Sequence, residues 1–459
     1  MGDYERFIAG KRFTIEPVGF SVESLNKHLK PFQADATRWA IRVGRCDLSE
    51  DVGLGKTIQQ LCYADEIIRR GGALRGLILC PLAVAQQTKR ESEKFEIQTN
   101  VKVCREQSEV ESGITITNYE RLHKFDCSKF DLLVADEISC IKGIDSKLKE
   151  QMFSEFRNTK YKLGCSATLA PNDYTEMGNQ AEFLGVMTGN EMKSMFFTHD
   201  GGETSKWRLR GHAQEEFWKW LGTFVMMIRK PSDIGHSDEG YELPPLNIID
   251  AVVENDLNEV GYLFAREAAT LAERRIARRS SVGKRVEFAA AQANESKEPW
   301  LLWCDLNAES QALAKAVNGA VEVTGSDPLD KKEESLMAFS SGQIRALVSK
   351  PSICGFGLNW QHCHEMSFVG LSDSFEQVYQ AIGRCRRFGQ KHAVNARFIV
   401  SELEGAVTAN IRRKWSDSDR MYAEAVKHMA AFNIENARGS GRIQTTYTPN
   451  KRMRLPQFI

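Results

Sequence analysis

The segment "DLSEDVGLGKTIQQL", residues 47–61, constrains the fold of this chain more than any other stretch. It joins an apolar run to an amphipathic helical pattern through Gly53 and Gly55, which Lys56 and Thr57 follow at once. A strand, a glycine-rich loop and a helix in this order surround phosphate oxygens with backbone N–H groups, and the positive end of the helix favours the anion. The chain is therefore expected to contain an α/β domain with a phosphate-binding loop.

The chemistry of this loop assigns a role to each polar residue. Lys56 is expected to reach the β- and γ-phosphates of a nucleotide, and the Thr57 hydroxyl to hold magnesium. The usual pattern begins with a glycine at position 50, where this chain has Glu50. A side chain at the start of the loop can point away from the phosphates, so Glu50 is compatible with a nucleotide site. The alternative is a surface turn in front of a helix.

A second motif, "FDLLVADEIS" at residues 130–139, supplies two acids at the end of an apolar strand. Ligands of open α/β sheets bind at this edge of the sheet. Asp136 is expected to hold magnesium through water, and Glu137 to orient and deprotonate an attacking water. The alternative is a strand that ends in two solvated acids.

Small hydroxyl residues follow another apolar strand in "GCSATLAPND", residues 164–173. Ser166 and Thr168 are expected to hydrogen-bond to the carboxylate strand and to respond to its ligand state. This short motif is weak by itself and is often without function.

Two arginines in "QVYQAIGRCRRFGQKH", residues 377–392, are three positions apart. On a predicted helix Arg384 and Arg387 would share one face. Arginines that reach a γ-phosphate from a facing lobe stabilise the transition state, and the site would be complete only when the lobes close. The alternative is a basic helix face on the surface.

Short apolar runs alternate with amphipathic stretches in both halves of the chain, a rhythm typical of parallel sheets flanked by helices. Between the halves, 212–230 is predicted to be one amphipathic helix, 240–247 a proline-containing linker and 258–285 a basic helix. Strands are expected at 74–82, 113–119, 130–136 and 160–168, and again, after the rhythm resumes at 299–307, at 319–325, 344–350, 365–371 and 395–401.

Composition places few limits on function. The 459 residues include 61 basic and 61 acidic side chains, so a nucleic-acid surface would have to be a local patch. There is no run of 18 apolar residues and no apolar signal sequence, so neither a membrane span nor secretion is expected. The 11 cysteines have no repeating spacing, which favours reduced thiols and a cytoplasmic location. The spacing of Cys354, His362, Cys363 and His364 does not fit a structural zinc site.

The order of "LKPFQADATRWA", "DVGLGKTIQ", "DEIS", "SAT", "GFGLN" and "QAIGRCRRFGQ" resembles superfamily 2 helicases, in particular the Swi/Snf-type branch. That branch also lacks the first glycine of the loop. The segments at 171–187 and 353–368 are similar to compact DNA helicases of bacteriophages and prophages, for which the host-cell cytoplasm is the expected location. The resemblance covers roughly residues 25–400, and the acidic motif departs from the common Asp-Glu-Ala-His.

The resemblance implies an α/β fold of two RecA-like P-loop domains with a helical insertion between them. The implied parts are an ATP-binding domain at 1–235 that holds the Q motif, a linker and basic insertion at 236–298, a second RecA-like domain at 299–436 and a basic tail at 437–459.

The resemblance also implies further site residues. Gln33 would read the adenine edge, and Gln380 would couple the last motif to the nucleotide. Nucleic-acid contacts are implied for Thr117 and Asn118 in the first domain, and for Lys350, Gly355 and Asn359 in the second.

The segment 274–285, "RRIARRSSVGKR", has basic side chains and no acid. It is either a grip on the DNA backbone through Arg274, Arg275, Arg278 and Arg279, or a solvated helix face.

The function expected from these residues is an ATP- and magnesium-dependent DNA helicase or translocase that acts on forked, branched or duplex DNA without sequence specificity. The alternative is an ATP-gated switch that binds DNA, or moves on duplex, without separating strands.

Overall fold

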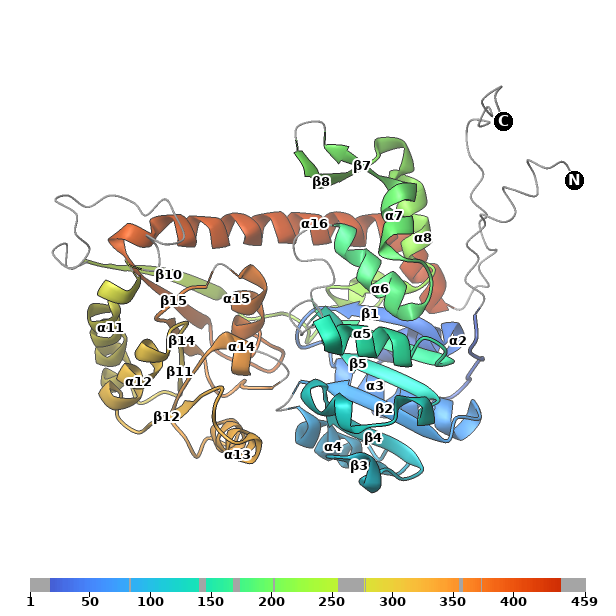
Figure 1. Ribbon diagram of the computed structural model, residues 1–459, viewed down its shortest axis with the longest axis horizontal. Helices are drawn as coiled ribbons and strands as arrows, with labels where there is room; N and C mark the ends of the chain where they lie inside the picture. Colours follow the sequence, from blue (N-terminus) through green and yellow to red (C-terminus); the bar gives the residue numbers. More distant parts are fainter. Residues whose placement is uncertain are drawn as a thin grey trace, which may run out of the picture.

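The computed structural model describes residues 17–81, 84–139, 146–167, 174–200, 203–254, 276, 278–354, 358–372 and 374–438. Its described part forms two lobes, each built on a parallel sheet with helices on its faces (Figure 1). The predicted α/β fold with two parallel sheets flanked by helices is thus confirmed.

The first lobe is built on a seven-stranded sheet in the order β3-β4-β2-β5-β6-β1-β9, with every pairing parallel. Its central strands are almost wholly buried because helices cover both faces. The strands are β1 (Arg45–Glu50), β2 (Arg75–Cys80), β3 (Val101–Val103), β4 (Gly113–Asn118), β5 (Leu132–Asp136), β6 (Tyr161–Ser166) and β9 (Val225–Ile228).

Four helices flank this sheet, and a smaller helical layer with a β-hairpin rises from one face (Figure 1). The flanking helices are α2 (Pro31–Val43), α3 (Lys56–Arg70), α4 (Ala85–Lys94) and α5 (Ser146–Glu155). The raised layer contains α6 (Met177–Leu184), α7 (Gly189–Phe196), α8 (Gln214–Leu221) and the antiparallel strands β7 (Phe197–Asp200) and β8 (Glu203–Leu209).

The second lobe is built on a six-stranded parallel sheet in the order β10-β15-β14-β11-β13-β12. Its strands are β10 (Leu246–Val253), β11 (Trp300–Trp303), β12 (Ala320–Val323), β13 (Ala346–Ser349), β14 (Glu365–Phe368) and β15 (Val394–Ser401). Its helices are α11 (Val282–Glu295), α12 (Asn307–Ala316), α13 (Leu329–Ser340), α14 (Pro351–Cys354) and α15 (Phe375–Ile382).

Two predicted segments fold differently from the expectation. The helix predicted over 212–230 ends at Leu221, and Val225–Ile228 form β9 because a buried position beside β1 is available to this apolar run. The linker and insertion predicted over 236–298 contain β10, which pairs with β15 in register over its whole length. Helix α11 from the same segment packs its alanines into the second lobe, so β10 and α11 belong to that lobe.

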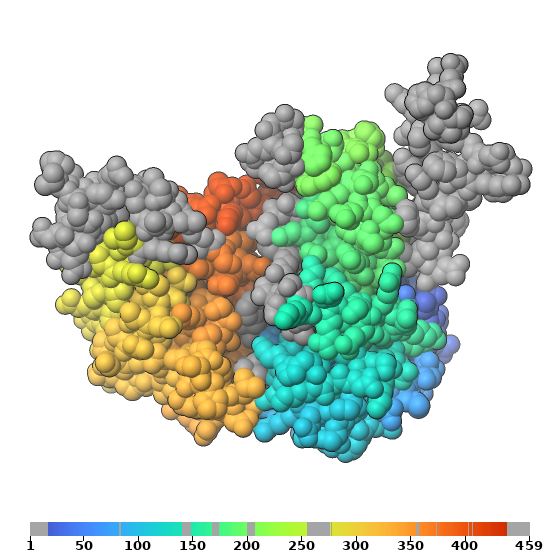
Figure 2. Space-filling model, in the orientation of Figure 1, coloured from blue at the N-terminus to red at the C-terminus, as the bar shows by residue number. Residues whose placement is uncertain are grey.

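A long helix, α16 (Gly405–Arg438), runs from the second lobe across to the first (Figure 1). Val407 and Ile411 near its start are buried in the core of the second lobe. Ala425 and Met429 near its end are buried in the core of the first lobe, which corrects the assignment of 299–436 to a single domain. Figure 2 shows the lobes as two masses that also meet at the lower end of the view. Arg105 of the first lobe pairs with Asp330 of α13 in the second lobe at 2.9 Å.

Candidate nucleotide site between the two lobes

The loop between β1 and α3 has the backbone of a phosphate-binding loop. Gly53 and Gly55 have φ angles of 87° and 83°, a left-handed conformation that glycine adopts without strain. Gly55 forms the N-cap of α3, so the first N–H groups of a fifteen-residue helix point into the loop. Lys56 and Thr57 open that helix, as the sequence predicted.

The Lys56 ammonium turns back over its own loop. Its Nζ donates to the carbonyl oxygens of Glu50 at 2.7 Å and of Asp51 at 3.2 Å. The Glu50 carboxylate accepts a 2.7 Å hydrogen bond from Gln59 of α3. Glu50, at the position of the missing glycine, is fully buried, and this burial raises its pKa to about 7.

The two acids lie at the end of β5, beside the loop. Gln60 donates to Asp136 Oδ1 at 2.6 Å, and it stands four residues after Lys56 on the same face of α3. Burial, and then the neighbouring charge of Glu137, raise the pKa of Asp136 to about 6. Glu137 has a φ of 52°, which is rare for a residue other than glycine and turns its carboxylate out of the strand direction.

The second lobe reaches this acid pair through α15. Gln380 Nε2 donates to Glu137 Oε2 at 3.3 Å, and its Oε1 accepts from the Arg384 guanidinium at 3.0 Å. Arg384 and Arg387 both donate to the carbonyl oxygen of Leu358, at 3.2 and 2.9 Å. The sequence therefore identified residues that the structure brings together from distant parts of the chain.

The predicted helical relation between the two arginines is wrong. Helix α15 ends at Ile382, and Arg384 and Arg387 lie in the turn behind it. Burial, followed by the charge of Arg387, lowers the pKa of Arg384, whereas Glu137 and Asp136 oppose that shift. Arginine stays charged in proteins, so both guanidinium groups present positive charge near the acids.

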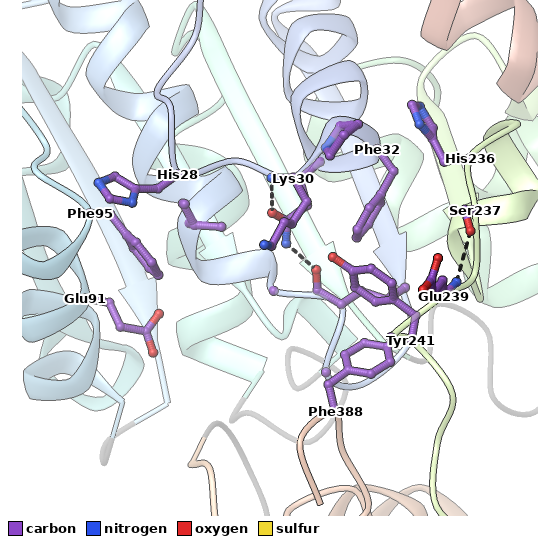
Figure 3. A pocket seen from close by; sticks show the side chains of 17 residues that line it. His28, Lys30, Phe32, Glu91, Phe95, His236, Ser237, Glu239, Tyr241 and Phe388 are labelled. Atoms are coloured by element: carbon purple, nitrogen blue, oxygen red, sulfur yellow. Dashed lines mark hydrogen bonds between the residues drawn. The ribbon is translucent and has the colours of Figure 1, made fainter.

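A cavity of about 780 Å³ opens beside the loop and is lined by both lobes (Figure 3). Gln33 links the wall of this cavity to the phosphate-binding loop. The Gln33 Nε2 donates to Leu54 O at 2.7 Å, and the Gln33 Oε1 accepts from Lys30 N at 2.9 Å. Tyr241 stands edge-on between Phe32 and Phe388, with centroid distances of 5.1 and 4.6 Å. Tyr241 and Gln60 were not predicted as site residues, although the spacing of Gln60 from Lys56 could have identified it.

The predicted coupling residues are only partly described. Ser166 is buried at the end of β6, next to β1 and β5 in the sheet. Thr168 lies outside the described residues.

The predicted nucleic-acid residues fall into different surroundings. Thr117 and Asn118 are each 1% exposed, and the Asn118 side chain caps the next turn by accepting from Arg121 N. Lys350 is half-buried after β13, and Asn359 is exposed. Gly355, Arg274 and Arg275 lie outside the described residues.

The basic segment is partly structural. Arg278 is buried and donates to Glu404 at 2.9 Å and to Asp305 at 2.6 Å. Arg285 is buried in an ion pair with Glu309 at 2.7 Å. These acids come from distant segments that the sequence did not link to the arginines, so the prediction that Arg278 contacts DNA is wrong. Arg279 is exposed.

The donor set fits a magnesium-bound nucleoside triphosphate. Thr57 and Asp136 offer hard oxygen ligands beside a loop built for phosphates, and magnesium prefers such ligands. The fold and the site together define a two-lobed α/β protein with a phosphate-binding loop at the interface of its lobes.

Curated relatives match part of the chain, whereas no protein-family model matches it. The chromodomain-helicase-DNA-binding protein 1-like of Danio rerio is 28% identical over 185 residues, 34% of this chain and 17% of the relative. The SWI/SNF-related matrix-associated actin-dependent regulator of chromatin subfamily A-like protein 1 of Xenopus tropicalis is 29% identical over 165 residues, again 34% of this chain and 17% of the relative. The matched segment thus spans 17% of the length of these relatives.

Among solved structures, the SWI2/SNF2 ATPase core of Sulfolobus solfataricus in complex with double-stranded DNA covers 91% of this chain and 99% of its own. Its sequence identity is 18% and its TM-score is 0.42. The core domain of the same name gives 18% and 0.41 over 84% of this chain and 87% of its own. The sequence matches thus show a similarity between about a third of this chain and these two relatives. No helix within the described residues is both long and apolar enough to cross a membrane.

Proposed function

We propose that this protein is a DNA-dependent ATPase of the SWI2/SNF2 type that uses ATP hydrolysis to move along DNA. The observation that carries the proposal is the contact between Gln380 of the second lobe and Glu137 of the first, with Arg384 bound to the same glutamine. Acid and arginine groups from separate lobes form one site, so a change in the bound nucleotide must change the relation of the lobes.

Each group has a task in the proposed hydrolysis. Lys56 would exchange its bonds to Glu50 O and Asp51 O for phosphate oxygens. Thr57 and Asp136 would hold Mg²⁺, which would neutralise phosphate charge when bound. Glu137 would orient the attacking water and accept its proton, and Arg384 and Arg387 would stabilise charge that develops on the γ-phosphoryl group.

The cavity beside the loop would take the nucleoside part of ATP. Gln33 would read the base edge, while Phe388 and Tyr241 offer aromatic walls on which a base can pack. Phe388 comes from the second lobe, so the base and the γ-phosphate would both be enclosed from two sides.

The DNA partner is proposed from the Danio rerio relative, whose name includes the terms helicase and DNA-binding. Forked, branched or duplex DNA would bind through its backbone, at Lys350, Asn359 and Arg279 among the described residues. Strand separation or branch migration, a role in replication, recombination or repair, the bacteriophage or prophage type and a cytoplasmic location belong to the proposal.

An ATP-gated DNA-binding switch is the second candidate, since the same closure could clamp DNA without travel. The experiment measures ATP hydrolysis and strand displacement on forks, Holliday junctions, blunt DNA duplexes and RNA duplexes. A motor hydrolyses ATP faster with DNA and displaces a paired or third strand, whereas a switch binds DNA with ATP and displaces nothing.

Two variants test the chemistry in the same assay. Lys56→Ala is expected to weaken nucleotide binding because it removes a phosphate contact. Glu137→Gln is expected to bind ATP normally and to lose about 10²- to 10⁴-fold in turnover, the usual contribution of a general base. If DNA does not change the rate of ATP hydrolysis by the wild-type protein, the proposed motor is contradicted.

A further inference from the structure

Residue 379, next to Gln380 on α15, makes a second polar contact across the lobe interface. The Tyr379 hydroxyl donates to Asp51 Oδ1 at 2.8 Å. Asp51 begins the phosphate-binding loop, whereas Glu137, the partner of Gln380, ends β5. One short helix of the second lobe thus contacts both halves of the proposed catalytic site.

Asp51 is held firmly within the loop. The same Oδ1 accepts the Val52 N–H at 2.7 Å, and the Asp51 N–H donates to Ile228 O at 3.0 Å. The Asp51 carbonyl oxygen in turn accepts from Lys56 Nζ. The tyrosine is therefore two hydrogen bonds away from the ammonium group that would hold the phosphates.

The chain after Tyr379 packs closely on the loop. A Cβ atom on Gly383 would stand 2.9 Å from Val52 Cγ1, and one on Gly53 would stand 3.3 Å from the Phe388 ring and 3.4 Å from Arg387 Cβ. Such spacing leaves little room for α15 to slide, so the contact at Tyr379 fixes where the following turn lies.

Helix α16 supports this contact from behind. The Trp415 ring packs on Tyr379 with centroids 5.4 Å apart. About one turn further along α16, Asp419 pairs with Arg229 at 2.7 Å, and about two turns further the Tyr422 hydroxyl donates to Ser49 O at 2.8 Å. The helix that orients the tyrosine ring is therefore anchored on the strand that leads into the loop.

We propose that Tyr379 is a positioning residue, which sets α15 on the phosphate-binding loop so that Arg384 and Arg387 reach the γ-phosphate. This inference rests on the proposed function. Tyr379 acts through the arginines and does not itself contact the reacting atoms.

The test is Tyr379→Phe in the full chain, which keeps the ring packing and removes the hydroxyl. Loss of a hydrogen bond to a carboxylate is expected to lower kcat about tenfold, with KM for ATP within about twofold and Tm lowered by only about 2 to 4 °C. Tyr161→Phe is the matched control, because it removes the hydroxyl bond of another buried tyrosine, to Gly71 O at 3.2 Å, within the first lobe and away from the lobe interface. This control is expected to hydrolyse ATP like the wild type.

A double-mutant cycle with Arg387→Ala separates positioning from a general structural role. If Tyr379 acts through the arginines, Tyr379→Phe lowers single-turnover hydrolysis less than about twofold in the Arg387→Ala background. An equal loss in both backgrounds overturns the inference, as does an unchanged kcat or a joint change of kcat, KM and Tm. Wild-type protein without ATP hydrolysis would instead refute the proposed function, and the inference with it.

Discussion

Two pairs of buried arginines differ in what neutralises their charge. Arg278 and Arg285 bind carboxylates of Glu404, Asp305 and Glu309 at ion-pair distance. Among the described residues, Arg384 and Arg387 have no carboxylate within that distance, and they donate to the carbonyl oxygen of Leu358 and, for Arg384, to Gln380.

This difference separates structural charge from charge that a ligand can use. An arginine that is already paired with a carboxylate of its own lobe has a structural role. Its removal leaves a buried acid without a partner, which destabilises the lobe. An arginine bound only to neutral oxygens keeps its charge for an anion that enters the site. A basic pattern in the sequence does not distinguish the two cases.

The largest expected effect concerns the pair without carboxylates. Arg387→Ala should lower kcat for ATP hydrolysis about 10³-fold with nearly normal ATP binding, because an arginine finger acts on the transition state. Steady-state turnover and binding of a fluorescent ATP analogue measure the two quantities. Wild-type turnover in this variant would remove the distinction between the two pairs.

Removal of an arginine from the structural pair, Arg278 and Arg285, should lower the free energy of unfolding. Arg285→Ala is expected to destabilise the second lobe by about 3 to 5 kcal/mol, because Glu309 remains buried without its partner. Urea unfolding followed by tryptophan fluorescence reports this loss. Removing both charges, as in Arg285→Met with Glu309→Gln, should restore most of the stability, because the amide oxygen at position 309 can still accept from the N–H groups of Asp305 and Leu306. A persistent loss would indicate a role beyond the ion pair.

Asp47 in β1 is an acid that, like Arg384 and Arg387, has no ion-pair partner among the described residues. Its buried carboxylate also accepts no hydrogen bond within this part of the chain. Burial raises its pKa to about 7, so the folded protein binds this proton more tightly than the unfolded chain, and stability falls as the pH rises from about 4 to 7. Asp47→Asn should therefore stabilise the protein at pH 8 by on the order of 2 kcal/mol and have little effect at pH 4. Thermal unfolding at both pH values tests this, and an equal gain at both would contradict the assigned cause.

The smallest effect is expected for an exposed cation. Arg279→Ala should weaken DNA binding by about two- to fivefold at low salt and reduce the salt dependence by about one charge. Lys297→Ala, another exposed cation of the second lobe, is the control outside the basic segment. Equal losses in both variants would show that the segment has no special contact with DNA.

The local motifs were predictable because each depends on neighbours in the chain. Gly53 and Gly55 before Lys56 indicate a loop and a helix start, and the structure has both. The apolar run before Asp136 indicates a buried strand, which is β5. Strand β10 was missed because its pairing partner β15 lies more than a hundred residues away.

The sequence by itself determined the two parallel sheets, the phosphate-binding loop and the chemical groups of the candidate site, since periodicity and motif spacing are local properties. Only the tertiary structure decided which arginine meets an acid, how α16 joins the lobes and where Tyr379 rests. These outcomes depend on contacts between distant segments. The free energy of each contact is set by how deeply its groups are buried and by which hydrogen-bond or ion-pair partner the other segment supplies.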